Sequence, residues 1–343
     1  MTIEFRVRSA SAPRRIDRTF DRQLASVSVI IPIYNEERNI KLLLDRLFPV
    51  LDDLGRTFEV IGVNDGSTDR SLDELRKAAA SRPEFKVVSL ARNYGQTAAI
   101  MAGFDHATGE IIVPMDADLQ NDPADIPKLL AKMEEGYDVV SGWRKDRKDS
   151  AIRRNFMSRV ANRLISWISG VHLHDYGCSL KAYRRDVIGH VRLYGEMHRF
   201  VPIYAAWYGA RITELVVSHH PRQHGASKYG LERVLKVVLD LIVVRFLDRF
   251  LGKPIYLFGG FGLLWLAIAF LTLIYVFYLK FVDGLSMILT PLPILAAMSL
   301  MMGVTSILIG LLAEILVRIY FETRSKHIYH TRETLNFDTG PKI

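Results

Sequence analysis

Two long stretches without internal charge, both near the end of the chain, most strongly constrain how it can fold. Residues 254–280 carry no charged residue between their ends, and residues 291–317 carry only Glu314. A helix rises about 1.5 Å per residue and a bilayer core is about 30 Å thick, so either stretch can cross a membrane. The alternative is a pair of buried helices in a soluble protein. Because both stretches exceed the required length, the sequence favours two transmembrane helices joined as a hairpin by residues 281–290.

The distribution of basic residues predicts the orientation of this hairpin. Basic residues lie just outside the two stretches, whereas the short connection between them offers little beyond Lys280. They are Arg245, Arg249 and Lys253 before the hairpin, and Arg318, Arg324, Lys326 and Arg332 after it. Since cytoplasmic flanks are enriched in Lys and Arg, we expect both ends of the hairpin in the cytoplasm. The chain is therefore predicted to be a multi-pass protein of the inner (plasma) membrane.

Charge and cysteine content narrow the classes of partner. The formal net charge is +8, which suits anionic lipid or anionic substrates better than nucleic acid. Residues 1–26 form a basic arm without the apolar core of a secretory signal. The single cysteine, Cys178, excludes an intramolecular disulfide, fits a reducing compartment and is expected to be a buried packing residue.

The first 229 residues show the alternation typical of an α/β protein. Residues 27–33 (VSVIIPI) form a continuous apolar run, as expected of a buried parallel strand. Further strands are predicted over residues 58–63, 86–90, 110–115 and 137–141, with helical patterns between them. This alternation predicts a doubly wound, mostly parallel sheet.

Polar residues follow four of the predicted strands. They are Tyr34-Asn35-Glu36, Asn64-Asp65, Arg92-Asn93 and the segment from Asp116 to Gln120. Ligands of such sheets bind outside the carboxyl ends of the strands, so we expect these residues on one rim. The sequence contains neither a G-x-G-x-x-G turn nor a Walker A loop. Carboxylates and amides instead suit Mg²⁺ or Mn²⁺ completed by the phosphates of a nucleotide.

Five motifs then point to a family. VSVIIPIYNEE, NDGSTD, LARNYGQTAAIMAGFDHATGEII, DADLQNDP and DYGCSLKAYRR occur in this order. They resemble the family 2 glycosyltransferases of GT-A fold, and among them the polyprenyl-phosphate sugar synthases. That group includes dolichyl-phosphate mannose synthase, polyprenyl-phosphate glucosyltransferases and undecaprenyl-phosphate formamido-arabinose transferase. The resemblance extends over about residues 27–329.

The resemblance and the apolar pattern together predict the domain organisation. The expected order is a basic arm (1–26), a GT-A domain (27–229), an amphipathic interfacial helix (230–252), the hairpin (253–320) and a cytoplasmic tail (321–343). The interfacial helix is expected because apolar residues recur there at helical spacing among scattered charges.

The resemblance also implies a donor site. Pro32, Tyr34 and Glu36 would hold the nucleotide base, with Asp65 near the base and ribose. Asp116 would lie near the ribose and the metal, and Asp118 and Gln120 would ligate Mg²⁺ or Mn²⁺. The alternative role for Gln120 is a helix-capping amide. Asn121 and Asp122 are expected to serve the turn and the cap before Pro123.

An acceptor site follows from the same resemblance. Arg144, Arg154 and Ser158 correspond to positions that contact the lipid phosphate. Arg222 and Lys228, in HHPRQHGASKYG, would approach donor or acceptor phosphate; the alternative is a basic juxtamembrane segment that touches only anionic lipid. His198 and Arg199 correspond to a segment near acceptor and sugar.

The implied activity is inverting transfer of a sugar from a nucleotide sugar, UDP-linked or alternatively GDP-linked, to a polyprenyl phosphate. A phosphate monoester has a second pKa of about 6, so it needs charge compensation and no general base. Asp116, Asp118, Arg222 and Lys228 are the predicted catalytic residues. Expected partners are both substrates, the membrane and a possible second copy of the chain, with no nucleic acid.

Three other functions compete with this one. A processive polysaccharide synthase of the same fold would carry a Q-x-x-R-W motif, and no Arg-Trp pair occurs here. A non-enzymatic membrane scaffold would be expected to lose the rim residues. A nucleotidyltransferase would not explain the hairpin.

Overall fold

The structure is a computed structural model of the 343-residue chain. It describes residues 25–145, 165–166, 169–189, 191, 193, 197–221, 253–286, 290–322 and 328–337. These residues fall into two compact units, one built around a β-sheet and one consisting of two long helices. The basic arm up to residue 24 and the predicted interfacial helix lie outside the described residues.

An eight-stranded sheet organises the first unit, in the order β7-β5-β6-β4-β1-β2-β3-β8. The strands are β1 (Val27–Ile33), β2 (Phe58–Asn64), β3 (Phe85–Leu90), β4 (Ile111–Pro114), β5 (Val139–Trp143), β6 (Lys181–Arg184), β7 (Ile212–Val216) and β8 (Thr331–Leu335). The helices of this unit are α1 (Glu37–Asp52), α2 (Ser71–Ser81), α3 (Gln96–His106), η1 (Pro123–Asp125), α4 (Ile126–Glu134), α6 (Arg185–Ile188), η2 (Met197–Phe200) and α7 (Val201–Trp207).

The sheet is mixed, which confirms the predicted GT-A-like α/β architecture. Strand β1 pairs in parallel with β2 and β4, β2 with β3, and β5 with β7. Strand β6 runs antiparallel between β4 and β5, and β8 runs antiparallel along β3. Strands β1 to β5 thus match the alternation in the sequence, while β6, β7 and β8 come from segments in which no strand was predicted.

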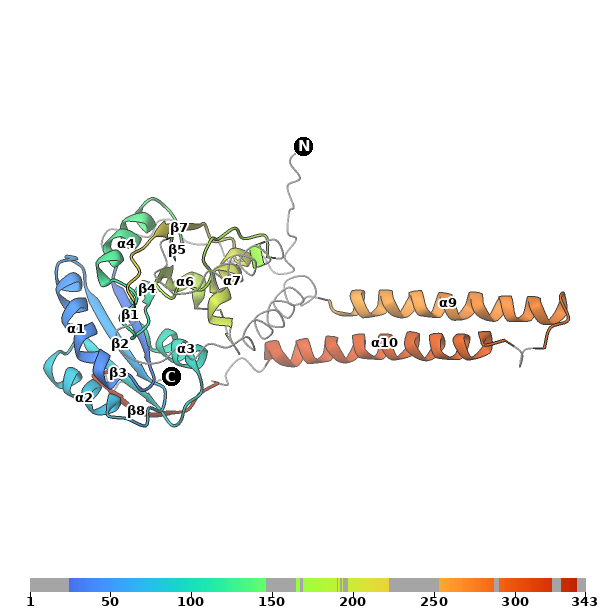
Figure 1. The fold of residues 1–343 in the computed structure, drawn as a ribbon, viewed down its shortest axis with the longest axis horizontal. Coiled ribbons are helices and arrows are strands. Elements are labelled where there is room, and N and C mark those ends of the chain that lie inside the picture. Colours follow the sequence, from blue (N-terminus) through green and yellow to red (C-terminus); the bar gives the residue numbers. More distant parts are fainter. Residues whose placement is uncertain are drawn as a thin grey trace. The chain divides into compact units, whose positions relative to one another are not determined.

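Side-chain alternation along β1 assigns its two faces to different helices. Val29 and Ile31 belong to the core cluster that includes residues of α1, α2 and α4. Ile30 points the other way, because a Cβ added to Gly103 of α3 would lie 2.2 Å from its Cγ2 atom. Figure 1 accordingly shows α1 and α3 on opposite sides of β1 and β2. Close packing of α3 brings its first residues to the rim of the sheet.

Strand β8 belongs to the segment for which the sequence predicts only a tail. Its Glu333 carboxylate pairs with Arg76 of α2 at 2.7 Å. Asn336, directly after the strand, donates from Nδ2 to the carbonyl oxygens of Ala79 and Phe85 at 2.7 and 2.8 Å. The chain after the two long helices therefore returns to cover the β3 edge.

The second unit is a helical hairpin of α9 (Ile255–Phe281) and α10 (Leu292–Glu322), as predicted. Two segments, Ile255–Phe281 and Leu292–Leu316, are long and apolar enough to cross a membrane. The backbones approach closely at two glycines: a Cβ on Gly262 would lie 2.9 Å from the Gly303 carbonyl oxygen. Ser306 Oγ donates to the Phe258 carbonyl oxygen at 2.8 Å, so a polar group also joins the helices.

Candidate active site

The loops that follow β1 and β2 are joined by side chain to backbone hydrogen bonds. Asn35, with a left-handed φ of 57°, accepts at Oδ1 from the backbone N–H of Thr68 at 2.8 Å. The backbone N–H groups of Asn35 and Glu36 donate to the hydroxyls of Ser67 and Ser71 at 3.1 and 2.9 Å. These hydrogen bonds fix the loop after β1 against the loop after β2, so the polar residues after both strands lie on one rim.

Asp65 connects the end of β2 to the beginning of α3. Its carboxylate accepts from the backbone N–H groups of Tyr94 at 2.7 Å and Gly95 at 2.9 Å. Burial raises the pKa of Asp65, although these two hydrogen bonds lower it. Both carboxylate oxygens are thus engaged by the protein itself. The predicted contact with base or ribose stays a prediction; the geometry shows a brace that positions α3.

Asp116 and Asp118 follow β4 at the centre of the rim. Gln96 is the first residue of α3, and its Nε2 donates a hydrogen bond to Asp116 Oδ1 at 2.8 Å. Asp118 is buried and accepts from the backbone N–H of Gln120 at 3.1 Å. Burial, followed by repulsion from Asp118, raises the pKa of Asp116. Asp118 therefore lies close enough to Asp116 to disfavour the charged form of that carboxyl group.

A non-glycine residue in the left-handed region lies between these acids and Gln120. Leu119 has a φ of 62° and a side chain that is 1% exposed. Such a conformation is unfavourable for Leu and persists where packing imposes it, often at functional sites. Asp122 caps η1 by accepting from the Ala124 N–H at 3.0 Å, which confirms its predicted capping role.

The chain that leads to the predicted basic loop runs beside this segment. The backbone N–H of His220 donates to the Gln120 carbonyl oxygen at 2.9 Å, and Asn121 forms a β-bridge with His219. This described segment ends at Pro221, so Arg222 and Lys228 lie outside the described residues. Arg154 and Ser158 lie outside them as well. The structure thus brings the start of the basic loop to the carboxylates.

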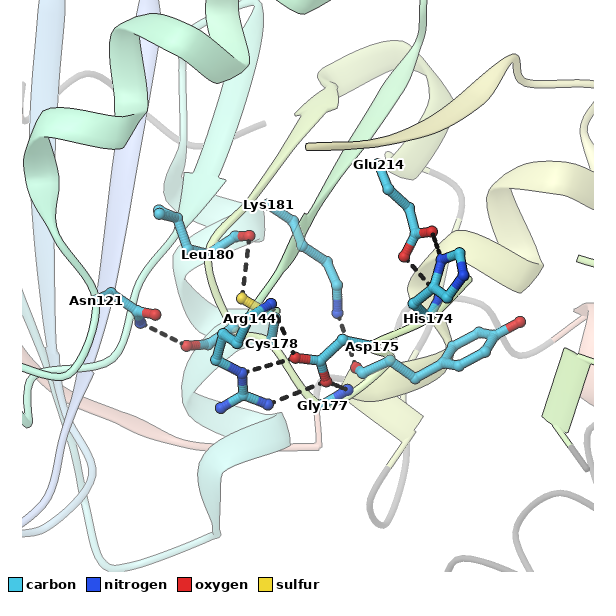
Figure 2. Close-up of polar contacts among 11 residues, drawn as sticks. Asn121, Arg144, His174, Asp175, Gly177, Cys178, Leu180, Lys181 and Glu214 are labelled. Atoms are coloured by element: carbon cyan, nitrogen blue, oxygen red, sulfur yellow. Dashed lines mark hydrogen bonds and ion pairs between the residues drawn. The ribbon is translucent and has the colours of Figure 1, made fainter. Parts of the chain in front are cut away.

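Arg144, predicted to contact lipid phosphate, already has an anionic partner. Its Nε and one terminal nitrogen donate to the two Asp175 oxygens at 2.7 and 3.1 Å (Figure 2). Burial lowers the pKa of Arg144, but the Asp175 carboxylate outweighs burial and raises it. Asp175 also accepts from the Gly177 N–H at 3.1 Å, which fixes the turn containing Cys178. Cys178 is fully buried, as predicted.

The predicted base-binding residues lie along the first strand and its loop. Pro32 lies in β1, Tyr34 and Glu36 lie in the loop after it, and all three are half-buried. Glu36 accepts at Oε2 from Asn39 Nδ2 at 2.6 Å. Their contact with a nucleotide base stays a prediction.

A pocket opens beside Asp116 and reveals residues that sequence reasoning missed. One side is the face of α3 that carries Gln96, Ile100 and Phe104. Lys181 and Tyr183 of β6 also line the pocket, with His198 and Arg199 of η2. Lys181 and Tyr183 lie two positions apart, as residues on one face of a strand do. This spacing is the only feature of the sequence that could have predicted that both side chains line a pocket. The motif around these residues gave no reason to single out a buried lysine.

The donor set near Asp116 fits a divalent cation. Two carboxylates with one amide nearby are oxygen ligands of the kind that Mg²⁺ and Mn²⁺ take together with substrate phosphates. Burial and repulsion from Asp118 raise the pKa of Asp116, and a bound cation would favour the charged form of its carboxylate. Within the described ranges, no three His, Cys, Asp or Glu side chains are grouped to hold a metal.

Comparison with known proteins agrees with this geometry. Residues 28–192 match the family described as glycosyl transferase family 2. The chain is 42% identical to dodecaprenyl-phosphate galacturonate synthase of Rhizobium johnstonii, over 91% of this chain and 93% of that one. It is 39% identical to undecaprenyl-phosphate 4-deoxy-4-formamido-L-arabinose transferase of Shewanella sediminis, over 90% of this chain and 92% of that one.

A solved structure of glucosyl-3-phosphoglycerate synthase from Mycobacterium tuberculosis, in complex with Mn²⁺, UDP and phosphoglyceric acid, is more distant. It is 19% identical, with a TM-score of 0.49, over 64% of this chain and 78% of that chain.

Together with these matches, the carboxylates at the rim of a mixed sheet of GT-A type identify the class of protein as a glycosyltransferase. The chain belongs to glycosyl transferase family 2, with similarity to two polyprenyl-phosphate sugar transferases over nearly its full length.

Proposed function

We propose that this enzyme transfers a sugar from a nucleotide sugar to a polyprenyl phosphate, with inversion and with help from Mg²⁺ or Mn²⁺. The observation that carries the proposal is the pair of acids after β4: Asp118 is buried, and the half-buried Asp116 lines a pocket together with the cationic side chains of Lys181 and Arg199. The full-length similarity to enzymes named for polyprenyl-phosphate acceptors supports the choice of acceptor.

The reaction is a single displacement at the anomeric carbon. A phosphate oxygen of the lipid forms a bond to that carbon while the bond to the β-phosphate oxygen breaks. The electron pair of the broken bond leaves with the nucleoside diphosphate. No proton has to be removed, because a phosphate monoester is already largely dianionic near neutral pH. A general base is therefore unnecessary, and charge compensation becomes the main task of the site.

The chain's own residues divide this task between two sides of the pocket. A metal at Asp116 and Asp118, with Gln120 as a further ligand, would neutralise charge growing on the departing diphosphate. Pro32, Tyr34, Glu36 and Asp65 orient the nucleotide. Gln96 holds the Asp116 carboxylate through its 2.8 Å hydrogen bond.

The acceptor phosphate needs cations on the other side. Arg144, Arg154 and Ser158 are proposed to bind it, with Arg222 and Lys228 closing over both substrates. Arg144 would bind the acceptor phosphate while it stays in its ion pair with Asp175. That pairing holds the guanidinium in a fixed plane and leaves one terminal nitrogen outside the bidentate contact.

The proposed location follows from the hairpin. Helices α9 and α10 would span the inner membrane, with residues 230–252 at its surface and the sheet unit in the cytoplasm. A water-soluble donor and a lipid acceptor can then meet at one site.

The test is a transfer assay with purified enzyme, undecaprenyl phosphate, Mn²⁺ and a panel of UDP- and GDP-linked sugars. We expect at least one donor to give a lipid-linked sugar, with activity lost in excess EDTA and restored by Mn²⁺ or Mg²⁺. Transfer to a glycan or protein acceptor, with none to lipid from any donor, would contradict the proposal. The names of the two relatives leave the sugar open, since one concerns an acidic sugar and the other a formamido sugar.

A further inference from the structure

A buried lysine lies in the pocket beside Asp116 without a carboxylate of its own. Lys181 is 3% exposed and lines the pocket from β6. Its ammonium donates to the Tyr176 carbonyl oxygen at 3.1 Å (Figure 2). Among the described residues this is its one hydrogen-bond acceptor, and no carboxylate lies within ion-pair distance. An ammonium has three donors, so the residues that the structure describes leave two of them unused.

The neighbouring acid, Asp175, favours the charged form of Lys181 through its negative charge, but its ion pair is with Arg144. Asp175 lies six positions before Lys181, and its two oxygens are taken by the guanidinium of Arg144 and the backbone N–H of Gly177. Figure 2 shows the Lys181 side chain reaching towards this pair without joining it. The Asp175 carboxylate thus lies near two cations, Arg144 and Lys181, and it forms its ion pair with Arg144.

The rest of the pocket wall adds positive charge and hydrogen-bonding groups. Arg199 lines the pocket with Lys181 and is close enough to disfavour the charged form of that lysine. His198 also lines it and is held by a 2.7 Å hydrogen bond between its Nδ1 and Thr97 Oγ1. The acid of the pocket, Asp116, is bonded to Gln96 and belongs to the proposed metal end. The end formed by β6 and η2 is therefore cationic.

A buried ammonium without a counter-ion is costly, so a site that keeps one is expected to receive an anion from its ligand. The nucleotide phosphates belong to the metal end, at Asp116 and Asp118. The part of the donor that extends from there into the pocket is the sugar. Ile100 and Phe104 supply an apolar surface against which a sugar ring can pack.

We propose that the donor carries a carboxylate on its sugar, as in a uronic acid, and that Lys181 is the specificity-determining residue that binds this carboxylate. The assignment rests on the proposed function, because it presumes a nucleotide-sugar donor at this rim. Arg199 contributes positive charge to the same end of the pocket. A neutral sugar would leave the Lys181 ammonium buried without a counter-ion.

Two matched donor pairs test the assignment on the wild-type enzyme. UDP-galacturonate and UDP-galactose differ only in a carboxylate against a hydroxymethyl group, as do UDP-glucuronate and UDP-glucose. With undecaprenyl phosphate and Mn²⁺, we expect kcat/KM for one uronate donor to exceed that of its neutral counterpart at least tenfold. If any neutral sugar donor of the panel is used more efficiently than both uronate donors, the inference is overturned and the proposed function stays intact. Absence of lipid product from every donor overturns both.

Substitution of the lysine shows which anion it binds. Lys181→Met should lower kcat/KM for the uronate at least tenfold and change that of the neutral counterpart little. Lys181→Arg, which keeps the charge, should retain most of the preference. Lys77→Met, at a lysine on the outer surface of α2 paired with Glu74, is the control and should leave both values unchanged.

An equal loss for both members of a pair in Lys181→Met would mean that Lys181 binds a phosphate common to all donors, or the acceptor phosphate. That result overturns the assignment. If Lys181→Met does not fold, judged by its thermal unfolding midpoint, the donor preference of the wild type and of Lys181→Arg still decides.

Discussion

At the scale of single residues, the site depends on carboxylates whose surroundings differ. Asp65 is tied to the backbone of Tyr94 and Gly95, and Asp175 is tied to Arg144. Asp116 and Asp118 instead lie beside each other, and their repulsion helps raise the pKa of Asp116. Only this last pair is arranged so that an added cation would stabilise it.

Asp118→Asn should therefore remove most of the activity while leaving the fold intact. Loss of one ligand charge weakens metal binding and the stabilisation of the departing diphosphate, so kcat/KM should fall by at least about a hundredfold. The measurement is sugar transfer to undecaprenyl phosphate across a Mn²⁺ titration. Asp73→Asn, at an exposed acid of α2, serves as the control. Full activity of Asp118→Asn at low Mn²⁺ would show that Asp118 is not a ligand.

Glu59 provides a residue-scale prediction about pH. Burial raises its pKa, but bonds from Lys86, Ser28 and Thr108 outweigh burial and lower it below 4.5. The charged form therefore stabilises the fold above pH 4.5, and this contribution is lost as pH falls through the lowered pKa.

Glu59→Gln should cost about 1–3 kcal/mol of unfolding free energy at pH 7, because buried donors lose a charged acceptor. Thermal unfolding midpoints of purified wild type and variant, compared between pH 7 and pH 3.5, measure the effect. The difference should shrink at the lower pH. A difference that stays constant over this range would contradict the assignment of the stabilisation to the carboxylate charge.

At the scale of elements, strands β1 to β5 could be predicted from the sequence, whereas β6, β7 and β8 could not. Strand β1 is a continuous apolar run, and a polar rim follows it. Strand β8 (TRETL) and strand β7 (ITELV) are short, and their burial pattern is mostly half-exposed or exposed. Such edge strands lack the hydrophobic signal on which strand prediction depends. They form because β3 and β5 offer them a partner.

The same limit applies to the site. The acids after β4 could be found because they directly follow an apolar run. The pairing of Arg144 with Asp175 joins residues 31 positions apart, and the approach of Gln96 to Asp116 spans 20 positions. No local pattern encodes these contacts. The first joins the loop after β5 to the segment before β6, and the second arises when α3 packs against β1, the strand beside β4.

Packing of α3 against β1 is an element-scale requirement of the active site. A Cβ on Gly103 would lie 2.2 Å from Ile30 Cγ2, so Gly103→Ala should displace the helix and cost about 1–3 kcal/mol. Transfer activity should fall as well, because Gln96 begins this helix. Ile30→Ala should recover part of the lost midpoint in the double variant, although alone it leaves a cavity. If the two substitutions lower the unfolding midpoint by additive amounts, the side chains at positions 30 and 103 are not in contact.

At the scale of the whole molecule, the hairpin determines where the enzyme works. Cys178 is buried, and burial raises the pKa of its thiol to about 11, so the native thiol is a poor target for labelling. This gives a clean background for mapping topology with introduced cysteines.

Asp283→Cys, in the turn after α9, should react with a membrane-impermeant maleimide added to spheroplasts. Ser67→Cys, on the loop after β2, should react only after the membrane is permeabilised. Both variants carry Cys178→Ser. Labelling of Ser67→Cys without permeabilisation would place the sheet unit outside the cytoplasm and contradict the proposed orientation.

The measurement that most directly tests the central claim is the structure of the lipid product. The wild-type enzyme is given its preferred donor and undecaprenyl phosphate, and the product is analysed by mass spectrometry and NMR. The account predicts one phosphate between sugar and lipid, with anomeric configuration opposite to that of the donor. A product with two phosphates, or with the donor's configuration retained, would contradict direct attack by a lipid phosphate oxygen.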